Sequence, residues 1–224
     1  MKKDLCELIV IIDESGSMDE VWGKTITGFN EFVQTHQKLP GEAKLTLVKF
    51  NTEYNIVHNG LNVKDVPLLN NKTYVPNGMT ALLDAVGKTI DEVGKRLSNT
   101  AEDERPEKVI VLIITDGYEN SSKEYTGKQV AEKIKKQTDV YSWEFVYMGA
   151  DQDAIAVGGS MNMTNTVNFN KLNIGHAMKG ATYHSSNSRT KSANTSMANY
   201  ALSDEELTRG IDELINKVPN ADGN

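Results

Sequence analysis

Short apolar runs alternate with amphipathic helical patterns along this chain. The runs are rich in β-branched residues, and each has the length of one buried strand. They cover residues 5–12, 45–50, 109–114 and 143–148. Two shorter runs, at 54–57 and 166–169, predict an extra strand paired with the second and a final strand at the edge of the sheet.

The segments between these runs carry apolar residues at helical spacing. Three faces are apparent: Trp22, Ile26, Phe29 and Val33; then Leu83, Val86, Ile90 and Leu97; then Val130 and Ile134. This alternation predicts an α/β, doubly wound fold, with a mostly parallel central sheet, helices on both faces and right-handed crossovers. In folds of this kind, ligands bind where the strands end in loops.

The composition changes after residue 170. We therefore expect one domain over 1–170 and a C-terminal extension over 171–224, which contains a Ser- and Asn-rich segment and a terminal helix. Within the extension, 183–199 shows little apolar periodicity and carries Arg189 and Lys191. It is interpreted as a solvated linker, with phosphate binding or modification as the alternative.

A terminal helix is predicted to begin after Ser203. Glu206, three residues on, completes a capping-box pattern, and Leu207, Ile211 and Leu214 form one apolar stripe. This stripe could dock on the chain's own domain or enter a groove of a partner, and the sequence leaves both alternatives open.

Charge and cysteine content restrict the classes of function. A formal net charge of −7 argues against nucleic acid or an anionic membrane as the main partner, since those surfaces attract clustered Lys and Arg. No stretch approaches the roughly 18 to 20 apolar residues that span a bilayer, and the run at 5–12 is interpreted as a strand and not as a signal peptide. Cys6 is the only cysteine, which favours a reducing, cytoplasmic location. The four scattered histidines are given no catalytic role.

Oxygen-bearing side chains gather in the loops that follow two predicted strands. Asp13, Ser15 and Ser17 stand at alternate positions of one tight loop, where Gly16 permits a bend that turns them toward a common centre. Asp116 follows another strand, so two carboxylates lie at the carboxyl ends of central strands. Oxygen ligands suit Mg²⁺ or Mn²⁺, with Ca²⁺ as a looser alternative, whereas zinc normally recruits His or Cys.

Three motifs in this order resemble the von Willebrand factor A domain family and its metal-ion-dependent adhesion site (MIDAS). They are Asp13-Glu14-Ser15-Gly16-Ser17, Gly78-Met79-Thr80 at the start of a predicted helix, and Thr115-Asp116-Gly117. The resemblance covers roughly residues 5–170. It implies that hydroxyls of Ser15, Ser17 and Thr80 bind the ion, while Asp13 and Asp116 act directly or through water. Runs at 78–85, 103–106 and 149–154 are similar to small stand-alone A-domain proteins of bacteria and their phages.

The resemblance implies a protein-binding module and not an enzyme. If one or both carboxylates stay in the outer shell, a divalent ion remains electron-poor and keeps an open coordination position. An Asp or Glu side chain of a partner protein is expected to fill that position. An ATPase or an assembly complex is the expected kind of partner.

Two other interpretations compete with the metal site. Ser15, Ser17 and Thr80 could cap helices, and Asp116 could cap a turn. Alternatively, a Mg²⁺-dependent phosphohydrolase could use Asp13 as its nucleophile. Such enzymes usually carry a second acid two residues later, where this chain has Ser15, and a supporting Lys that the sequence does not place.

Two further signals are given ordinary interpretations. Asp151 and Asp153, which follow the run at 143–148, are expected to cap a helix, with a contribution to the metal face as the alternative. A serine hydrolase built on Ser15 or Ser17 lacks a nearby base, and the Gly-x-Ser-x-Gly pattern is absent from the sequence.

Overall fold

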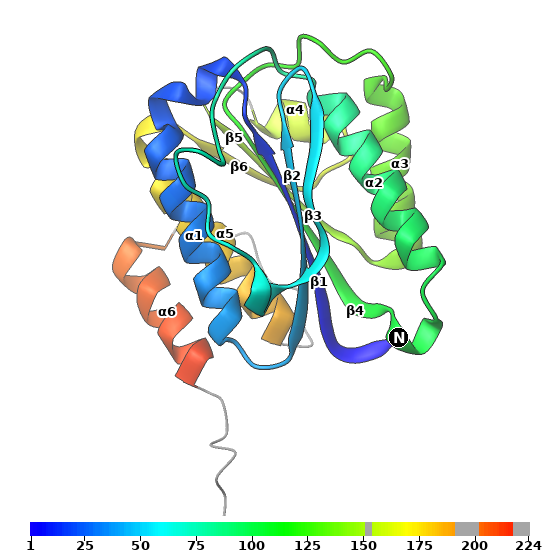
Figure 1. Cartoon of the computed structure of the whole chain (residues 1–224), viewed down its shortest axis with the longest axis vertical. Coiled ribbons are helices and arrows are strands. Elements are labelled where there is room, and N and C mark those ends of the chain that lie inside the picture. Colours follow the sequence, from blue (N-terminus) through cyan, green and yellow to red (C-terminus); the bar gives the residue numbers. More distant parts are fainter. Residues whose placement is uncertain (151–153, 191–201, 217–224) are drawn as a thin grey trace, which may run out of the picture.

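Six strands form one sheet in the order β3-β2-β1-β4-β5-β6. They are β1 (Lys2–Asp13), β2 (Glu42–Phe50), β3 (Tyr54–Asn62), β4 (Pro106–Thr115), β5 (Glu144–Ala150) and β6 (Asn165–Phe169). β3 runs antiparallel to β2, and every other neighbouring pair is parallel. The computed structural model describes residues 1–150, 154–190 and 202–216 (Figure 1). The predicted strands, including the antiparallel strand and the edge strand, are confirmed.

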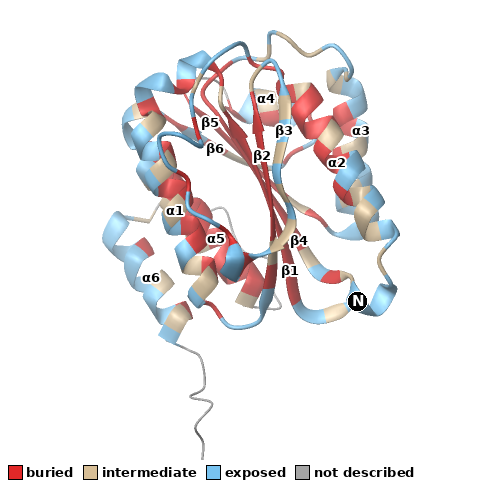
Figure 2. Ribbon diagram, viewed as in Figure 1, coloured by how far each residue is buried: buried red, intermediate tan, exposed pale blue. Residues whose placement is uncertain are grey.

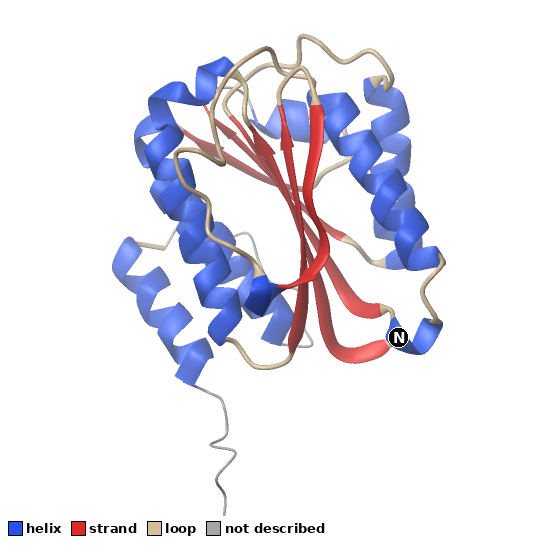
Figure 3. Ribbon diagram, viewed as in Figure 1, coloured by secondary structure: helices blue, strands red, loops and turns tan. Residues whose placement is uncertain are grey.

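Helices cover both faces of the sheet (Figure 3). They are α1 (Trp22–Lys38), α2 (Leu82–Ser98), α3 (Gly127–Tyr141), α4 (Ala154–Ser160), α5 (Ile174–Thr190) and α6 (Asp204–Asn216), with short 3-10 turns η1 (Gly16–Val21), η2 (Val63–Asp65), η3 (Glu102–Glu104) and η4 (Lys171–Asn173). Apolar residues of α1 and α5 pack on one face, and those of α2, α3 and α4 pack on the other. The α/β, doubly wound arrangement expected from the sequence is confirmed.

β1 lies at the centre of the sheet and is buried along most of its length (Figure 2). Leu8, Val10 and Ile12 contribute to the core shared with α1 and α5, whereas Ile9 and Ile11 contribute to the core on the opposite face. β1 pairs with β2 on one side and with β4 on the other. Because the chain proceeds from β1 to β2 and from β4 to β5, the winding reverses between β1 and β4. Ligands of open α/β sheets bind at such a switch point.

The terminal helix α6 packs on its own chain. Ser203 N donates a hydrogen bond to Glu206 Oε2 at 2.7 Å, and Glu206 N donates one to Ser203 Oγ at 3.3 Å, so the predicted capping box is confirmed. Leu207 and Leu214 are buried, and α6 contacts α5. The apolar stripe therefore docks within the chain, which was one of the two alternatives.

The interpretation of the Ser- and Asn-rich segment as a solvated linker is wrong as far as α5 extends. Ser185 Oγ donates to Ala181 O at 2.8 Å, one turn back, so a hydroxyl of this kind is satisfied inside the helix and can be buried. α5 also lies close against α1, because a Cβ added at Gly28 would come within 2.7 Å of the Met178 side chain. Residues 191–199 of the expected linker lie outside the described residues.

The last turns of α5 are tied to the end of α1 by buried polar contacts. Arg189 Nη1 donates to His36 O at 2.7 Å, and Arg189 Nη2 donates to Gly41 O at 2.7 Å and to Pro40 O at 3.1 Å. His36 Nε2 and Ser185 Oγ share a hydrogen bond of 2.9 Å. Burial, and then the charge of Arg189, hold the pKa of His36 well below its usual range. These contacts join the expected extension to the sheet domain.

Two expectations about the whole chain concern its boundaries and membranes. The division at residue 170 stays a prediction, although α5, which follows it, packs on the same sheet as α1. In the described ranges, none of the helices combines the length and the apolar character needed to cross a membrane.

Candidate metal centre

Asp13 is the last residue of β1, and its carboxylate is buried beside β4. Asp13 Oδ1 accepts a hydrogen bond from Ser15 N at 2.7 Å, and Oδ2 accepts one from Thr115 Oγ1 at 2.5 Å. The parallel register of β1 and β4 brings these two strand ends together. Burial raises the pKa of Asp13 to about 6; the hydrogen bonds from Thr115 and Ser15 oppose that shift, and the charge of Asp116 adds to it.

The hydroxyls of the first loop lead from Asp13 toward Asp116. Ser15 Oγ lies 3.1 Å from Ser17 Oγ, and Ser17 Oγ donates to Asp116 Oδ1 at 2.6 Å. Ser17 and Asp116 are 99 positions apart in the sequence, and the switch point of the sheet makes them neighbours. Three predicted site residues therefore form one continuous chain of oxygen atoms.

Thr80 reaches this group of oxygens from the loop before α2. A Cβ added at Gly117 would lie 2.5 Å from Thr80 Oγ1 and 3.3 Å from Ser17 Oγ, so both hydroxyls flank one point beside the loop that carries Asp116. The Thr80 backbone is held in place, because its N donates to Asn120 Oδ1 at 2.9 Å and its O accepts from Asn120 N at 3.0 Å.

The capping interpretation is wrong for Ser15 and Thr80. Ser15 precedes η1, but its side chain makes no capping hydrogen bond. The cap residue of α2 is Ala81 and not Thr80, and the side chains of Glu119 and Ser122 accept hydrogen bonds from the first turn of this helix. Both hydroxyls therefore face the group of oxygens without serving a helix end.

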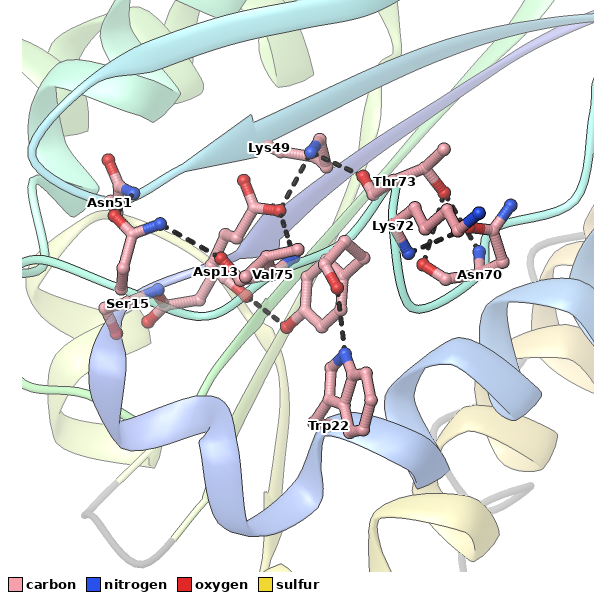
Figure 4. A network of polar contacts seen from close by, with 12 residues as sticks. Asp13, Ser15, Trp22, Lys49, Asn51, Asn70, Lys72, Thr73 and Val75 are labelled. Atoms are coloured by element: carbon pink, nitrogen blue, oxygen red, sulfur yellow. Dashed lines mark hydrogen bonds and ion pairs between the residues drawn. The ribbon is translucent and has the colours of Figure 1, made fainter.

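The loops that carry these side chains are fixed by a second set of contacts (Figure 4). Glu14 Oε1 accepts hydrogen bonds from Lys49 Nζ and Val75 N, both at 2.8 Å. Tyr74 Oη donates to Asp13 O at 2.6 Å. The segment before Thr80 is thus attached to the loop after β1, and these contacts hold the site residues in position.

Lys171 is a member of this region that the sequence did not reveal. It lies in η4, directly after β6, and its Nζ is 3.2 Å from Asp116 Oδ2, 3.0 Å from Glu20 Oε2 and 3.4 Å from Ser17 O. Burial lowers the pKa of Lys171, but the carboxylates of Glu20 and Asp116 outweigh this effect and raise it above its usual value. No local pattern marks this lysine, because its contacts depend on how β6 ends beside the first loop.

The side chains present fit a hard divalent cation. They offer hydroxyl and carboxylate oxygens, which are the donors that Mg²⁺, Mn²⁺ and Ca²⁺ prefer. Asp116 Oδ2 is buried and accepts no hydrogen bond from the described residues, while its ion pair with Lys171 lacks hydrogen-bond geometry. Within 1–150, 154–190 and 202–216, no group of three or more His, Cys, Asp or Glu side chains could hold a metal. Asp151 and Asp153 lie outside the described residues.

We expect a divalent ion to stabilise this chain, and Gly117→Ala should remove that stabilisation. The new methyl group would press against Thr80 Oγ1, and overpacking of this kind costs roughly 1–3 kcal/mol or moves the hydroxyl away. The measurement is the melting temperature with Mg²⁺ and with chelator. Gly23→Ala is the control, because a Cβ there meets no atom within 4 Å. An equal Mg²⁺-dependent rise in both variants would contradict the placement of Thr80 at the ion.

Comparison with known proteins places the chain among relatives of the same architecture. A family model described as von Willebrand factor type A domain matches residues 7–171. A search of curated proteins finds no match. The structure is similar to the vWF domain of the type V pili tip protein Mfa5 from Porphyromonas gingivalis, with 9% identity, a TM-score of 0.62, and coverage of 85% of this chain and 98% of that one.

Two further structures share the fold over part of their length. Proximal thread matrix protein 1 from the mussel byssus, with a zinc-occupied MIDAS motif, shows 15% identity and a TM-score of 0.55 and covers 78% of this chain and 46% of its own. The ArnB paralog VWA2 from Sulfolobus acidocaldarius shows 13% identity and a TM-score of 0.53, with coverage of 78% and 44%. This chain therefore spans less than half of either protein, and at these identities the likeness concerns the fold.

Proposed function

This chain belongs to the von Willebrand factor type A domain family, and we propose that it is a metal-dependent protein-binding module with one divalent cation at a MIDAS. The residues that would hold the ion are Asp13, Ser15, Ser17, Thr80 and Asp116. One observation carries the proposal: hydroxyls and carboxylates from three separate segments converge at the switch point of the sheet, and the hydroxyls of Ser15 and Thr80 are not used as helix caps.

The chemistry of these residues suits recognition of an acidic group. When bound, a divalent ion supplies an electrophilic position for a carboxylate oxygen of the partner. Ser15, Ser17 and Thr80 are neutral donors, so only Asp13 and Asp116 offset the charge of the ion. A partner protein that presents Asp or Glu is therefore the proposed ligand, with an ATPase or assembly complex as the proposed class and the cytoplasm as the proposed location.

The identity of the ion is proposed from the ligands. Oxygen donors without His or Cys favour Mg²⁺, with Mn²⁺ or Ca²⁺ as alternatives. Zinc belongs in the same titration, because the mussel protein has zinc in its MIDAS motif. The titration ranks the four ions by their dissociation constants.

For the phosphohydrolase alternative, the structure offers a candidate for the supporting lysine but no accessible nucleophile. Lys171 beside Asp116 could be the supporting lysine that such a reaction needs. The nucleophile would have to be Asp13, however, and this carboxylate is fully buried with both oxygens engaged as hydrogen-bond acceptors. A buried and fully bonded carboxylate is poorly placed to attack a phosphate ester, and this favours a binding function.

The test is capture of a partner from a lysate of the native host, in Mg²⁺ and in chelator. The wild-type chain should retain a partner protein in Mg²⁺ and not in chelator, and an excess of an Asp-containing peptide should displace that protein. The Asp13→Ala/Ser15→Ala double variant should retain none, while Ser98→Ala, which alters an exposed hydroxyl at the end of α2, should behave as wild type. Binding that ignores metal would contradict the proposal, and Mg²⁺-dependent release of phosphate from a phosphomonoester would favour the hydrolase.

A further inference from the structure

We propose that Lys171 is an internal cation that competes with the divalent ion for Asp116 and so lowers the metal affinity of the site. The inference deepens the proposed function and rests on it. The inference starts from the ammonium group of Lys171, which occupies a position beside Asp116, one of the two proposed anionic ligands. The Nζ of Lys171 lies 3.2 Å from Asp116 Oδ2.

The position of the ammonium group relative to the two oxygens of Asp116 supports competition. Asp116 Oδ1 already accepts a hydrogen bond from Ser17 Oγ at 2.6 Å. Asp116 Oδ2 accepts no hydrogen bond from the described residues, so it is the oxygen left for an ion or for a water molecule bound to an ion. Lys171 Nζ faces this second oxygen. Lys171 and the divalent ion would therefore compete for the same atom, Asp116 Oδ2.

The surroundings of the ammonium group show that this contact is built into the fold. Besides Asp116 Oδ2, the ammonium group has Glu20 Oε2 at 3.0 Å and Ser17 O at 3.4 Å, both from the turn that also carries the metal-site hydroxyl of Ser17. The Asp116 side chain is fully buried, while that of Lys171 is 25% exposed. A buried carboxylate needs a compensating charge, and Lys171 supplies one in the absence of metal.

Two other lysines near the loop after β1 have partners that are not proposed metal ligands. Lys49 Nζ pairs with Glu14 Oε1 and donates to Thr73 O, and these contacts hold the loop in position. Lys24 Nζ donates to Leu172 O at 3.0 Å and contacts η4, with no contact to Asp116 among its described interactions. Lys24 therefore offers a matched control, since its removal takes one positive charge from the same region and leaves Asp116 paired.

The experiment measures the dissociation constant for Mg²⁺ and Mn²⁺ by calorimetry on the full chain, together with the melting temperature in chelator. Lys171→Met should bind metal roughly tenfold more tightly than wild type, because a positive charge within about 4–6 Å lowers the affinity of a carboxylate for a proton by about tenfold or more, and we expect a similar effect on its affinity for a metal ion. Its melting temperature in chelator should fall, since Asp116 loses its counter-charge. Lys171→Arg and Lys24→Met should keep affinities close to wild type.

The outcomes separate this inference from the proposed function. Tighter binding in Lys171→Met, or binding that appears in this variant and is undetectable in wild type, supports competition. Equal or weaker binding in Lys171→Met, with clear binding in wild type, overturns the role of Lys171 and leaves the metal site intact. Absence of binding in every protein overturns both. Lys171→Gln repeats the comparison if Lys171→Met does not fold.

Discussion

Mg²⁺ at about 100 times its dissociation constant should raise the free energy of unfolding of wild type by about 2.7 kcal/mol, and Ser15→Ala should abolish that rise. For a chain of this length, the rise corresponds to roughly 5–10 °C in melting temperature. Ser15 is the most informative of the proposed ligands to remove, because its hydroxyl contacts Ser17 Oγ at 3.1 Å and caps no helix. Removal of this hydroxyl should therefore change the free energy of unfolding little in chelator and should remove most of the rise in Mg²⁺.

Asp116→Ala should abolish the Mg²⁺-dependent rise as well, but with a different result in chelator. It removes the acceptor of the Ser17 hydroxyl and leaves Lys171 without its buried partner. Lower stability in chelator is therefore expected for Asp116→Ala and not for Ser15→Ala. Ser98→Ala serves as the control for loss of a hydroxyl. Rises equal to wild type in the two site variants would show that these residues are not the ligands.

Most of the sheet could be predicted from the sequence, because its strands are short and apolar on both faces. β1 and β4 are buried on both sides, so their sequences are continuous runs that stand out from amphipathic helices. β3 is different, since alternate residues are exposed at the edge of the sheet. Its four-residue run at 54–57 was sufficient to predict the strand, but the observed strand extends to Asn62.

α5 was missed because only its first half carries an apolar stripe, which consists of Ile174, Ala177, Met178 and Ala181. In its second half the buried positions, such as Ser185, Ser186 and Asn187, are polar and give no apolar pattern in the sequence. The helix is stabilised by this stripe, by close contact with α1 at Gly28 and by contacts of its polar residues with other segments. Signals of this kind depend on the neighbouring helix, and a pattern within one segment cannot reveal them.

The candidate site also contains residues that the sequence could reveal and one that it could not. Asp13, Ser15 and Ser17 share one short loop, and Thr80 and Asp116 stand in motifs that resemble a known family, so all five could be proposed from the sequence. The structure brings Ser15, Ser17 and Asp116 into contact and places Thr80 beside Ser17. Lys171 belongs to no motif and lies 55 positions after Asp116 in the sequence, so only folding brings the two side chains together.

Arg189→Met should lower the free energy of unfolding by about 3 kcal/mol. The guanidinium group donates to the carbonyl oxygens of His36, Pro40 and Gly41, which lie at the end of α1 and in the following loop. The last carbonyls of a helix lack partners within the helix, and each one left buried without a hydrogen bond costs about 1–3 kcal/mol. Met retains the length of the side chain and removes its donors. Urea unfolding at neutral pH measures the change.

The same experiment decides whether α5 is part of the domain that carries the proposed metal site. Arg209→Met is the control, because Arg209 is exposed on α6 and its replacement should change stability by no more than about 0.5 kcal/mol. A single cooperative transition that is lowered only by Arg189→Met would mean that α5 unfolds together with the sheet, which would move the domain boundary beyond Thr190. If both variants matched wild type, α5 would be dispensable for the stability of the sheet, and the boundary predicted at residue 170 would hold. The first result is expected, because the residues that Arg189 contacts lead directly into β2, next to the central strand.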